Sequence, residues 1–318
     1  MNQDMESSFF AGKSFLVTGG AGFIGSHIAE QLLGLGASVT IVDDFSNGGI
    51  EKLPFKSDSL KIHQGDVRSF DYNSLGKVDG IFHEAARALI PSFKYPVTDL
   101  EVNTGGTIRI LEYARKHGVK VVYASSGSVY GNPIEIPITE KHPLNPISPY
   151  AASKMASEIY CGMYYREYHL NVTMLRYFNV YGPRQSVSEE MGVIPIFVKR
   201  SLEKKPLRIF GDGKQTRDFL NVMDVVNANL LAYKSEKAVG QFINIGGGGN
   251  EISILDLARL VMDLCNLHQE PVFTDPKPGD IRRLVADNSR AEGLIGYIPS
   301  ISLKDGLSKY IEFAKTSG

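Results

Sequence analysis

The stretch F-L-V-T-G-G-A-G-F-I-G-S-H at residues 15–27 decides the fold class. Its apolar start is typical of a buried strand, and Gly20, Gly22 and Gly25 match the pattern G-x-G-x-x-G. Glycines at these places let the backbone turn tightly and approach a diphosphate at the N-terminus of a helix. We therefore predict a strand, a dinucleotide-binding turn and then a helix over 23–35.

Outward from this turn, short apolar runs alternate with longer segments of helical periodicity. The predicted strands cover residues 14–18, 38–42, 60–63, 80–83, 120–124 and 172–177. The predicted helices cover 23–35, about 96–117 and about 149–169. This alternation is typical of βαβ units that form a parallel sheet with helices on both faces. We therefore predict an α/β fold with a Rossmann-type doubly wound parallel sheet.

The rhythm of strands and helices breaks after Asn179. The segment R-I-F-G-D-G-K-Q-T-R-D-F is typical of a turn between short strands, and Q-F-I-N-I-G-G-G-G-N of a strand that ends in a glycine run. We expect a smaller α/β lobe made of late segments that leave and rejoin the sheet. The predicted division gives the dinucleotide-binding domain residues 1–178 plus about 217–245, and the second, substrate-binding lobe about 179–216 plus 246–318.

Composition limits the class of protein. The chain has 318 residues, of which 43% are hydrophobic, and a formal net charge of -1, as in an ordinary globular protein. It has no basic stripe for nucleic acid, no apolar stretch long enough for a membrane span, and no metal-ligand spacing among its histidines. Cys161 and Cys265 are too few for a disulfide framework and favour a reducing compartment. We therefore expect a cytoplasmic protein with no nucleic-acid, membrane or metal partner.

The strand after the glycine turn ends in V-D-D and indicates which dinucleotide binds. Asp43 lies 18 residues beyond Gly25, where a carboxylate accepts hydrogen bonds from the adenine ribose. No arginine or lysine follows in D-D-F-S-N-G-G to bind a 2′-phosphate, so the sequence favours NAD over NADP. In Q-G-D-V-R, Asp66 and Val67 are placed to contact the adenine, although G-D is also a common turn.

The segment S-P-Y-A-A-S-K at 148–154 contains a candidate catalytic pair. Tyr150 and Lys154 are four residues apart at a predicted helix start, and therefore lie on one helical face. A lysine ammonium near a phenol lowers the pKa of the phenol, and a nicotinamide cation would lower it further. We expect Tyr150 to act as a base near neutral pH. A surface pair on an amphipathic helix is the alternative for an isolated Y-x-x-x-K.

The run Y-A-S-S-G-S-V-Y-G at 123–131 ends a predicted buried strand in small, mostly hydroxylic residues. Such residues fill no core. Ligands of this fold class bind at the carboxyl edge of the sheet, where this strand ends. We therefore expect a ligand to lie against residues 125–128.

Taken in order, these motifs make the chain resemble the extended short-chain dehydrogenase/reductases, specifically the NAD-dependent nucleotide-sugar epimerase/dehydratase family and its UDP-glucose 4-epimerase subgroup. The resemblance covers about residues 12–315, and its matching segments include T-G-G-A-G-F-I-G-S-H, F-H-E-A-A, S-P-Y-A-A-S-K, L-R-Y-F-N-V-Y-G-P-R and P-G-D-I-R-R-L-V-A-D. It implies NAD-dependent 4-epimerisation of a UDP-sugar through a transient 4-keto sugar. It also implies an isologous homodimer.

The resemblance implies roles for individual residues. Tyr150 matches the catalytic base of the family, and Lys154 matches the lysine that acts with this base. Ser126 matches the serine or threonine whose side chain forms a hydrogen bond with the reacting hydroxyl group of the sugar. The implied NAD contacts are Gly19, Gly22, Phe23, Ile24, Gly25, Asp43, Asn47, Asp66, Val67, Ala85, Ala86, Asn103, Ala124, Tyr150, Lys154 and Tyr177. The implied substrate contacts are Ser126, Asn179, Phe210, Arg217, Lys277, Asp280 and Leu284.

One departure from the family pattern favours epimerisation over elimination. Related dehydratases carry Thr-Asp-Glu where this chain has Ser126-Gly127-Ser128, so both carboxyl groups that remove water are missing. The alternatives are another enzyme of the family, namely a dehydratase, a decarboxylase or a 4-keto reductase, and a non-enzymatic NAD-binding protein.

Other departures from the family pattern leave the identity of the sugar undecided. In the 87–93 loop, Ala88 stands where galactose epimerases carry a lysine, and L-I-P-S-F lacks the arginine of S-V-P-R-S. Leu284 is intermediate in size at a position that sorts plain hexoses from N-acetylated sugars, so UDP-glucose/galactose, N-acetylated and uronic substrates all remain. Glu84 is charged where relatives carry an uncharged residue. We expect Glu84 to face solvent or an arginine, and assign it no catalytic role.

Overall fold

A computed structural model describes residues 8–47, 49–50, 53, 56–185, 192–276 and 281–316 of the chain. Its main element is a parallel sheet of seven strands in the order β11-β6-β5-β4-β1-β2-β3. The strands are β1 (Ser14–Thr18), β2 (Ser38–Asp43), β3 (Leu60–Gln64), β4 (Gly80–His83), β5 (Lys120–Ser126), β6 (Val172–Tyr177) and β11 (Phe242–Ile245). The predicted doubly wound sheet is confirmed.

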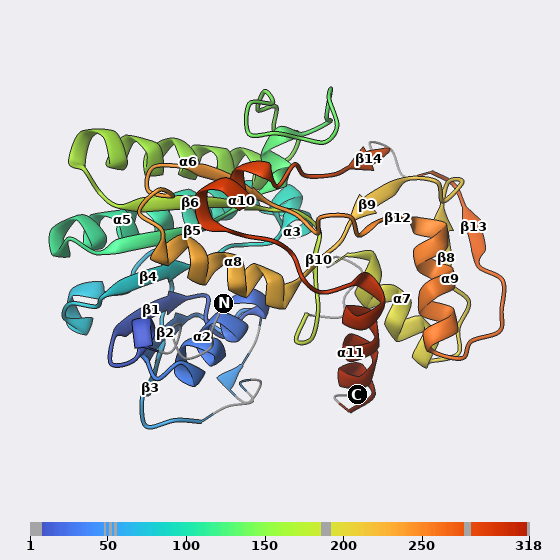
Figure 1. Cartoon of the computed structure of the whole chain (residues 1–318), viewed down its shortest axis with the longest axis horizontal. Helices are drawn as coiled ribbons and strands as arrows, with labels where there is room; N and C mark the ends of the chain where they lie inside the picture. The colour runs from blue at the N-terminus through green and yellow to red at the C-terminus, as the bar shows by residue number, and fades with distance from the viewer. Residues whose placement is uncertain are drawn as a thin grey trace.

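Helices cover both faces of this sheet, as Figure 1 shows. One face packs on α2 (Phe23–Gly34), α8 (Val222–Lys234) and α10 (Ser289–Ile295), and the other on α5 (Gly106–His117) and α6 (Pro149–Tyr168). Alternate residues of one strand enter the two cores: Phe15 and Val17 of β1 face α2, and Leu16 faces α5. The near-continuous apolar strands of the sequence reflect this burial on both faces.

The predicted helix over about 96–117 is divided in the structure. It consists of α4 (Pro96–Leu100), a π-helical turn η3 (Glu101–Gly105) and α5. Single π-helical turns are rare and are frequent at functional sites. Here the π turn contains Asn103, whose side chain is almost fully buried. Sequence periodicity did not reveal this turn, because a single π-helical turn is too short to have a periodic signature of its own.

The order of the strands creates a crevice. Chain connections run outward from β1 in one direction through β2 and β3, and in the other from β4 through β5, β6 and β11. The crevice lies outside the carboxyl ends of β1 and β4, where such folds bind ligands. Two short segments, α3 (Leu89–Lys94) and the 3-10 turn η4 (Gly127–Tyr130), lie near the crevice. The 3-10 turn η2 (Tyr72–Leu75) lies instead by the C-terminal end of α5, where Lys116 donates to Asn73 over 2.7 Å.

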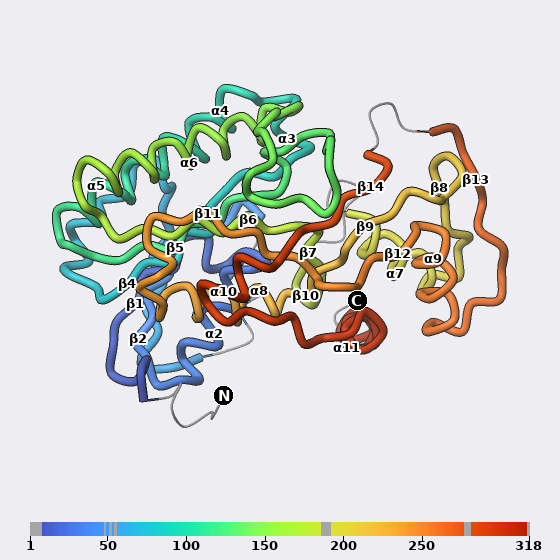
Figure 2. Tube along the Cα trace, turned by 45° about the horizontal axis from the view of Figure 1, so that its top comes forward, coloured from blue at the N-terminus to red at the C-terminus, as the bar shows by residue number. Residues whose placement is uncertain are grey.

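The second lobe has an apolar core of its own. Its elements are α7 (Val193–Leu202), β8 (Arg208–Phe210), β9 (Thr216–Asp218), β12 (Glu251–Ser253), α9 (Ile254–Leu264), β13 (Val272–Thr274), β14 (Arg283–Leu284) and α11 (Leu303–Thr316). Strands β7 (Val180–Tyr181) and β10 (Leu220–Asn221) pair in parallel between this lobe and the large sheet (Figure 2). The exact division of the chain between the two lobes stays a prediction.

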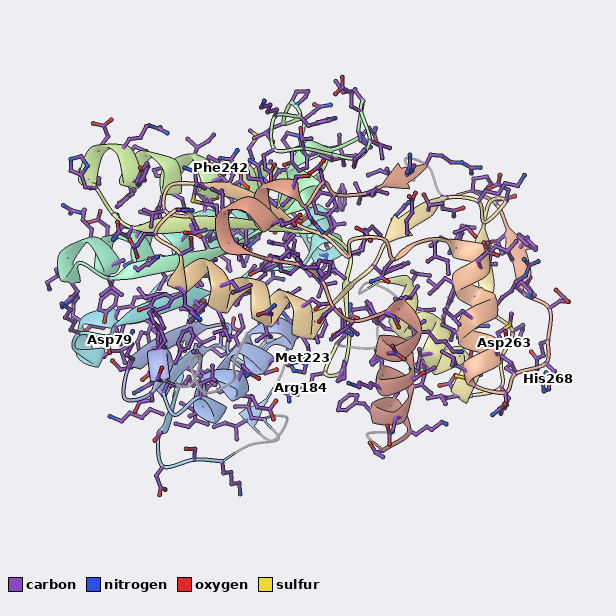
Figure 3. All side chains as sticks on the ribbon, viewed as in Figure 1. Asp79, Arg184, Met223, Phe242, Asp263 and His268 are labelled. Atoms are coloured by element: carbon purple, nitrogen blue, oxygen red, sulfur yellow. The ribbon has the colours of Figure 1, made fainter. Side chains whose placement is uncertain are left out.

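Arg184, labelled in Figure 3, ties the segment after β7 to α2 of the large domain. Its guanidinium donates to Ser26 Oγ over 3.3 Å and forms an ion pair with Glu30.

Asp263 and His268, also labelled in Figure 3, lie at the far end of the second lobe. Within the described residues, no helix is long and apolar enough to cross a membrane.

Candidate active site

A cavity opens at the carboxyl edge of the large sheet, at the crevice beside β1 and β4. Fifteen of the sixteen residues predicted to bind NAD line it, and they are Gly19, Gly22, Phe23, Ile24, Gly25, Asp43, Asn47, Asp66, Val67, Ala85, Ala86, Ala124, Tyr150, Lys154 and Tyr177. The wall also contains Ser125, from the segment expected to lie against a ligand. The residues of the wall that sequence reasoning missed are Val42, Asp44, Ser46, Gly65, Arg68, Glu84, Arg87, Ala88 and Val102. Predicted contacts at the carboxyl ends of six strands therefore meet in one place.

The glycine turn leaves no room for side chains. Gly19 has φ +66°, and a Cβ there would lie 2.7 Å from the backbone N of Ala85. A Cβ at Gly25 would collide with the carbonyl O of Gly19. No side chain caps the N-terminus of α2 beyond Gly22, so its first amides need another acceptor. A diphosphate fits that need, because a helix N-terminus favours negative charge and donates backbone N–H groups.

Asp43 stands at the end of β2 and fixes the turn. Its Oδ2 accepts from the N–H of Ala21 over 2.9 Å, and its Oδ1 accepts from the N–H of Phe45 over 2.8 Å. Burial raises the pKa of this carboxyl, and the two backbone hydrogen bonds oppose that rise. Each carboxylate oxygen keeps a lone pair for a ribose hydroxyl. The residue thus fits the role expected for an NAD ribose contact.

The carboxylate of Asp66 is held by a neighbour that the sequence did not single out. Asp66 Oδ1 accepts from the backbone N–H of Arg68 over 2.8 Å and from Nε of Arg68 over 3.0 Å. The guanidinium also lowers the pKa of Asp66. Arg68 continues to Glu101 of η3 over 3.0 Å. This pairing orients Asp66 at the cavity wall and leaves fewer lone pairs for an adenine amino group.

The candidate catalytic pair lies on the first turns of α6. Ser148 caps this helix by accepting from the N–H of Ala151 over 3.1 Å, and Pro149 occupies its first position. Lys154 Nζ lies 5.9 Å from the centre of the Tyr150 ring and donates to the carbonyl O of Ala124 over 2.7 Å. The helix start therefore presents both side chains to the end of β5.

The pKa of Tyr150 differs from the sequence expectation. Burial raises it to about 12, and the hydrogen bond with Ser126 opposes that rise, whereas Asp99 and Glu84 add to it. Burial lowers the pKa of Lys154 to about 8. The expected lowering by Lys154 is therefore outweighed in the chain alone, because the phenol is desolvated near two carboxyl groups. A phenolate at this position requires a further positive charge, which an oxidised nicotinamide carries.

Asn103 lies behind the cavity wall and stabilises it through hydrogen bonds. Its Nδ2 donates to Asp99 Oδ1 over 3.0 Å and to Ser153 Oγ over 2.9 Å, and its Oδ1 accepts from the N–H of Arg87 over 2.8 Å. Both donors are therefore used by the protein itself. Asn103, predicted to contact NAD, does not line the cavity but fixes the loop that follows β4.

Glu84 was expected to face solvent or an arginine, and that expectation is wrong. Its carboxyl lies at the cavity wall and accepts from the hydroxyl of Tyr177 over 3.1 Å. The alternation of β4 explains why: His83 bonds Thr18 and Thr107 on the α5 side, so the next side chain points to the other face. This period of two was a signal in the sequence that could have placed Glu84 inside.

The predicted substrate contacts gather around β9 of the second lobe. Asn179 donates to the carbonyl O of Asp218 over 3.3 Å, and Arg217 donates to the carbonyl O of Ile281 over 2.6 Å. Leu284 pairs with Arg217 between parallel strands. The other placements are Ser126, close to Tyr150 at the end of β5, and Phe210, 37% exposed at the end of β8. Lys277 and Asp280 lie outside the described residues.

Comparison with known proteins identifies the family. The sequence profile described as "NAD dependent epimerase/dehydratase family" matches residues 15–246. The chain belongs to this family. NAD is accordingly its cofactor, and the cavity residues described above fit that dinucleotide. The chain is thus a member of the NAD-dependent epimerases and dehydratases that act on nucleotide sugars.

Individual relatives differ in the sugar that they name. A UDP-glucose 4-epimerase of Mycolicibacterium smegmatis is 42% identical over 306 residues, which cover 94% of this chain and 97% of the relative. The UDP-glucose 4-epimerase of Thermotoga maritima, solved with UDP-glucose, has a TM-score of 0.89 and 36% identity, covering 96% of this chain and 99% of that one. A UDP-glucuronic acid 4-epimerase of Bacillus cereus, solved with UDP-glucuronic acid and NAD, has a TM-score of 0.87 and 32% identity. The match covers 95% of this chain and 99% of that one.

Replacing Gly25 with alanine tests the turn. Because the new Cβ would collide with the Gly19 carbonyl, Gly25→Ala should lower the NAD content of purified protein more than tenfold. Released nucleotide, measured after denaturation, gives this content. Gly34→Ala is the matched control on the same helix, since nothing lies within 4 Å of its Cβ, and its NAD content should equal that of the wild type. Full NAD content in Gly25→Ala would contradict the described turn.

Proposed function

We propose that this protein catalyses NAD-dependent 4-epimerisation of a UDP-sugar. The observation that carries the proposal is the set of groups at the end of β5: Ser126 lies close enough to Tyr150 to lower its pKa, Lys154 stands one turn along α6, and no carboxyl group follows Ser126 in η4. Such a set supplies one proton acceptor and one hydroxyl donor. Epimerisation needs only these, whereas elimination of water needs an additional acid-base pair.

Tyr150 carries the proton transfers in the proposed mechanism. Ser126 holds the C4 hydroxyl of the sugar, and Tyr150 accepts the proton of that hydroxyl. When bound, NAD supplies the acceptor and donor of the C4 hydride. The 4-keto sugar then turns within the site while the second lobe retains its UDP group. Tyr150 returns the proton to the C4 oxygen, and the sugar leaves with the opposite configuration at C4. Lys154 stabilises the phenolate by its charge.

The second lobe is proposed to hold the UDP group. Arg217 and Lys277 suit a diphosphate by charge, and Phe210 offers an exposed ring for the uracil. Asn179, Asp280 and Leu284 are proposed as the remaining contacts. Which sugar is carried is set by the 87–93 loop and by residue 284, both of which differ from the family patterns for plain hexoses and N-acetylated sugars.

The alternative is another enzyme of the same family, because relatives of similar identity act on uronic sugars and the family description includes dehydratases. A decarboxylase or dehydratase would release carbon dioxide or water, and a 4-keto reductase would consume added NADH. A non-enzymatic NAD-binding protein would turn over none of these, and the intact Ser126, Tyr150 and Lys154 argue against it.

Proton NMR of the anomeric region tests the proposal. Purified protein without added cofactor is incubated separately with UDP-galactose, UDP-N-acetylgalactosamine and UDP-glucuronic acid. A new anomeric signal from the C4 epimer of one sugar is expected, and it would name the sugar class. Silence with all three, after NAD has also been added, would overturn the proposed epimerisation.

The homodimer implied by the sequence is also a proposal. Exposed apolar side chains gather on α3, α4 and α6, which pack on one another, and they are Leu89, Ile90, Phe93, Tyr95, Val97, Leu100, Ile159 and Tyr160. An apolar patch of this kind is typical of a surface covered by another chain, and a second copy buries it by two-fold symmetry. Sedimentation equilibrium should give twice the chain mass; a monomer at micromolar concentration would contradict the proposal.

A further inference from the structure

A buried polar chain ends at the cavity wall. Asn229 of α8, fully buried, donates from Nδ2 to the carbonyl O of Val225 over 2.9 Å and to the hydroxyl O of Tyr177 over 2.8 Å. The hydroxyl of Tyr177 in turn donates to Oε1 of Glu84 over 3.1 Å. Because a phenol has one proton and a carboxylate is a stronger acceptor than an amide oxygen, this chain favours the ionised form of Glu84.

The negative charge of Glu84 is only partly compensated by the protein. Within the described ranges no basic side chain forms an ion pair with this carboxyl, and Lys154 acts on it only through space while donating to the Ala124 carbonyl. Burial raises the pKa of Glu84 to about 7, and the Tyr177 hydrogen bond and the Lys154 charge oppose that rise. Buried charges are ordinarily paired, and the through-space attraction of Lys154 compensates this carboxylate only in part, so a further cation bound in the cavity would stabilise it.

The oxidised nicotinamide is such a cation. In the proposed reaction, C4 of the sugar gives up a hydride, which is two electrons and one proton, and the C4 hydroxyl proton goes to Tyr150. The nicotinamide ring thereby changes from a charge of +1 to neutral. A fixed negative charge at the same cavity stabilises the oxidised form relative to the reduced form, because only the oxidised form is attracted to it.

We propose that Glu84 is a positioning charge that favours the oxidised over the reduced form of bound NAD. The purpose of this charge rests on the proposed function. A carboxylate here keeps the resting cofactor in its oxidised form and favours return of the hydride from the reduced cofactor to the 4-keto sugar. Tyr177 and Asn229 hold the carboxyl group in place. Family members with an uncharged residue at this position lack that bias.

Two variants separate the charge of Glu84 from its hydrogen bond. Glu84→Gln removes the charge but keeps an oxygen that accepts from Tyr177. Tyr177→Phe removes the hydrogen bond but keeps the carboxyl group. Glu84→Met serves as a second neutral variant should the glutamine protein fold poorly, and thermal unfolding followed by circular dichroism verifies that each variant is folded.

The experiment measures the preference of the protein for NAD+ over NADH. Purified protein is incubated with mixtures of NAD+ and NADH of set ratio until the bound ratio is constant. Free nucleotide is removed by gel filtration, and the released nucleotides are quantified by chromatography. Glu84→Gln is expected to shift the bound ratio toward NADH by about tenfold, or ~30 mV for this two-electron couple. Tyr177→Phe should shift the bound ratio in the same direction but by less than Glu84→Gln does, because loss of the hydrogen bond raises the pKa of Glu84 and removes only part of its negative charge.

A ratio in Glu84→Gln within about twofold of the wild type would overturn the inference. A larger shift in Tyr177→Phe than in Glu84→Gln would also overturn it, because the hydrogen bond rather than the charge would then set the preference. The binding measurement needs no sugar. Loss of the shift in a protein that still epimerises a UDP-sugar therefore counts against this inference alone, and an intact shift in a protein without epimerase activity counts against the proposed function alone.

Discussion

Tyr150→Phe is expected to lower turnover of the UDP-sugar by about a thousandfold, within the usual range for removal of a positioned proton-transfer group. Tyr150 lies close to Ser126 at the end of β5, where the sugar hydroxyl is proposed to react. Phenylalanine keeps the buried ring, so the cavity wall and the NAD content should be unchanged. Anomeric proton NMR measures turnover, and nucleotide released on denaturation measures NAD.

Tyr168→Phe is the matched control for this variant. Tyr168 ends the same helix, is 49% exposed and lies far along α6 from the cavity, so removal of its hydroxyl should leave turnover at the wild-type level. Turnover of Tyr150→Phe within about tenfold of the wild type would show that another group moves the proton. Loss of NAD together with turnover would instead indicate that the hydroxyl holds the cofactor.

The large sheet could be predicted because its signals are local. The apolar run before Gly19, the glycine spacing and the helical periodicity after Phe23 each depend on neighbouring residues, and they agree with one another. The placement of Asp43 and Lys154 followed from position alone, since the carboxyl ends of parallel strands meet at one edge. These residues line the cavity as expected.

The parts that escaped prediction depend on partners distant in sequence. Glu84 meets Tyr177 across 93 residues, and only the fold shows that the pair shares a cavity wall. Asn103 gives its amide to Asp99 and Ser153 because the π turn directs it inward, and no periodicity signals such a turn. The pKa of Tyr150 required the burial of its ring, which sequence spacing does not contain.

The same dependence on distant partners governs a buried ion pair beneath the catalytic strand end. Arg176 of β6 donates from Nη2 to Glu158 Oε2 over 2.6 Å and from Nε to Glu158 Oε1 over 2.8 Å, and the two side chains are 4% and 2% exposed. Ser125 donates to Glu158 over 2.6 Å, and Arg176 also donates to Tyr130 over 2.7 Å. The pair therefore joins β5, β6, η4 and α6 one turn beyond Lys154.

Arg176→Met is expected to lower the free energy of unfolding by about 3–5 kcal/mol, because it leaves the Glu158 carboxylate buried without its partner. The double variant Glu158→Leu/Arg176→Met should lose less than the single variant, about 1–3 kcal/mol, since it removes the stranded charge and leaves only Ser125 without its acceptor, whereas Tyr130 still donates to Asn244 over 2.7 Å. Urea unfolding with linear extrapolation measures each value. If the double variant lost as much as Arg176→Met or more, the two side chains would act independently, and the ion pair would not be what holds the strand end against α6.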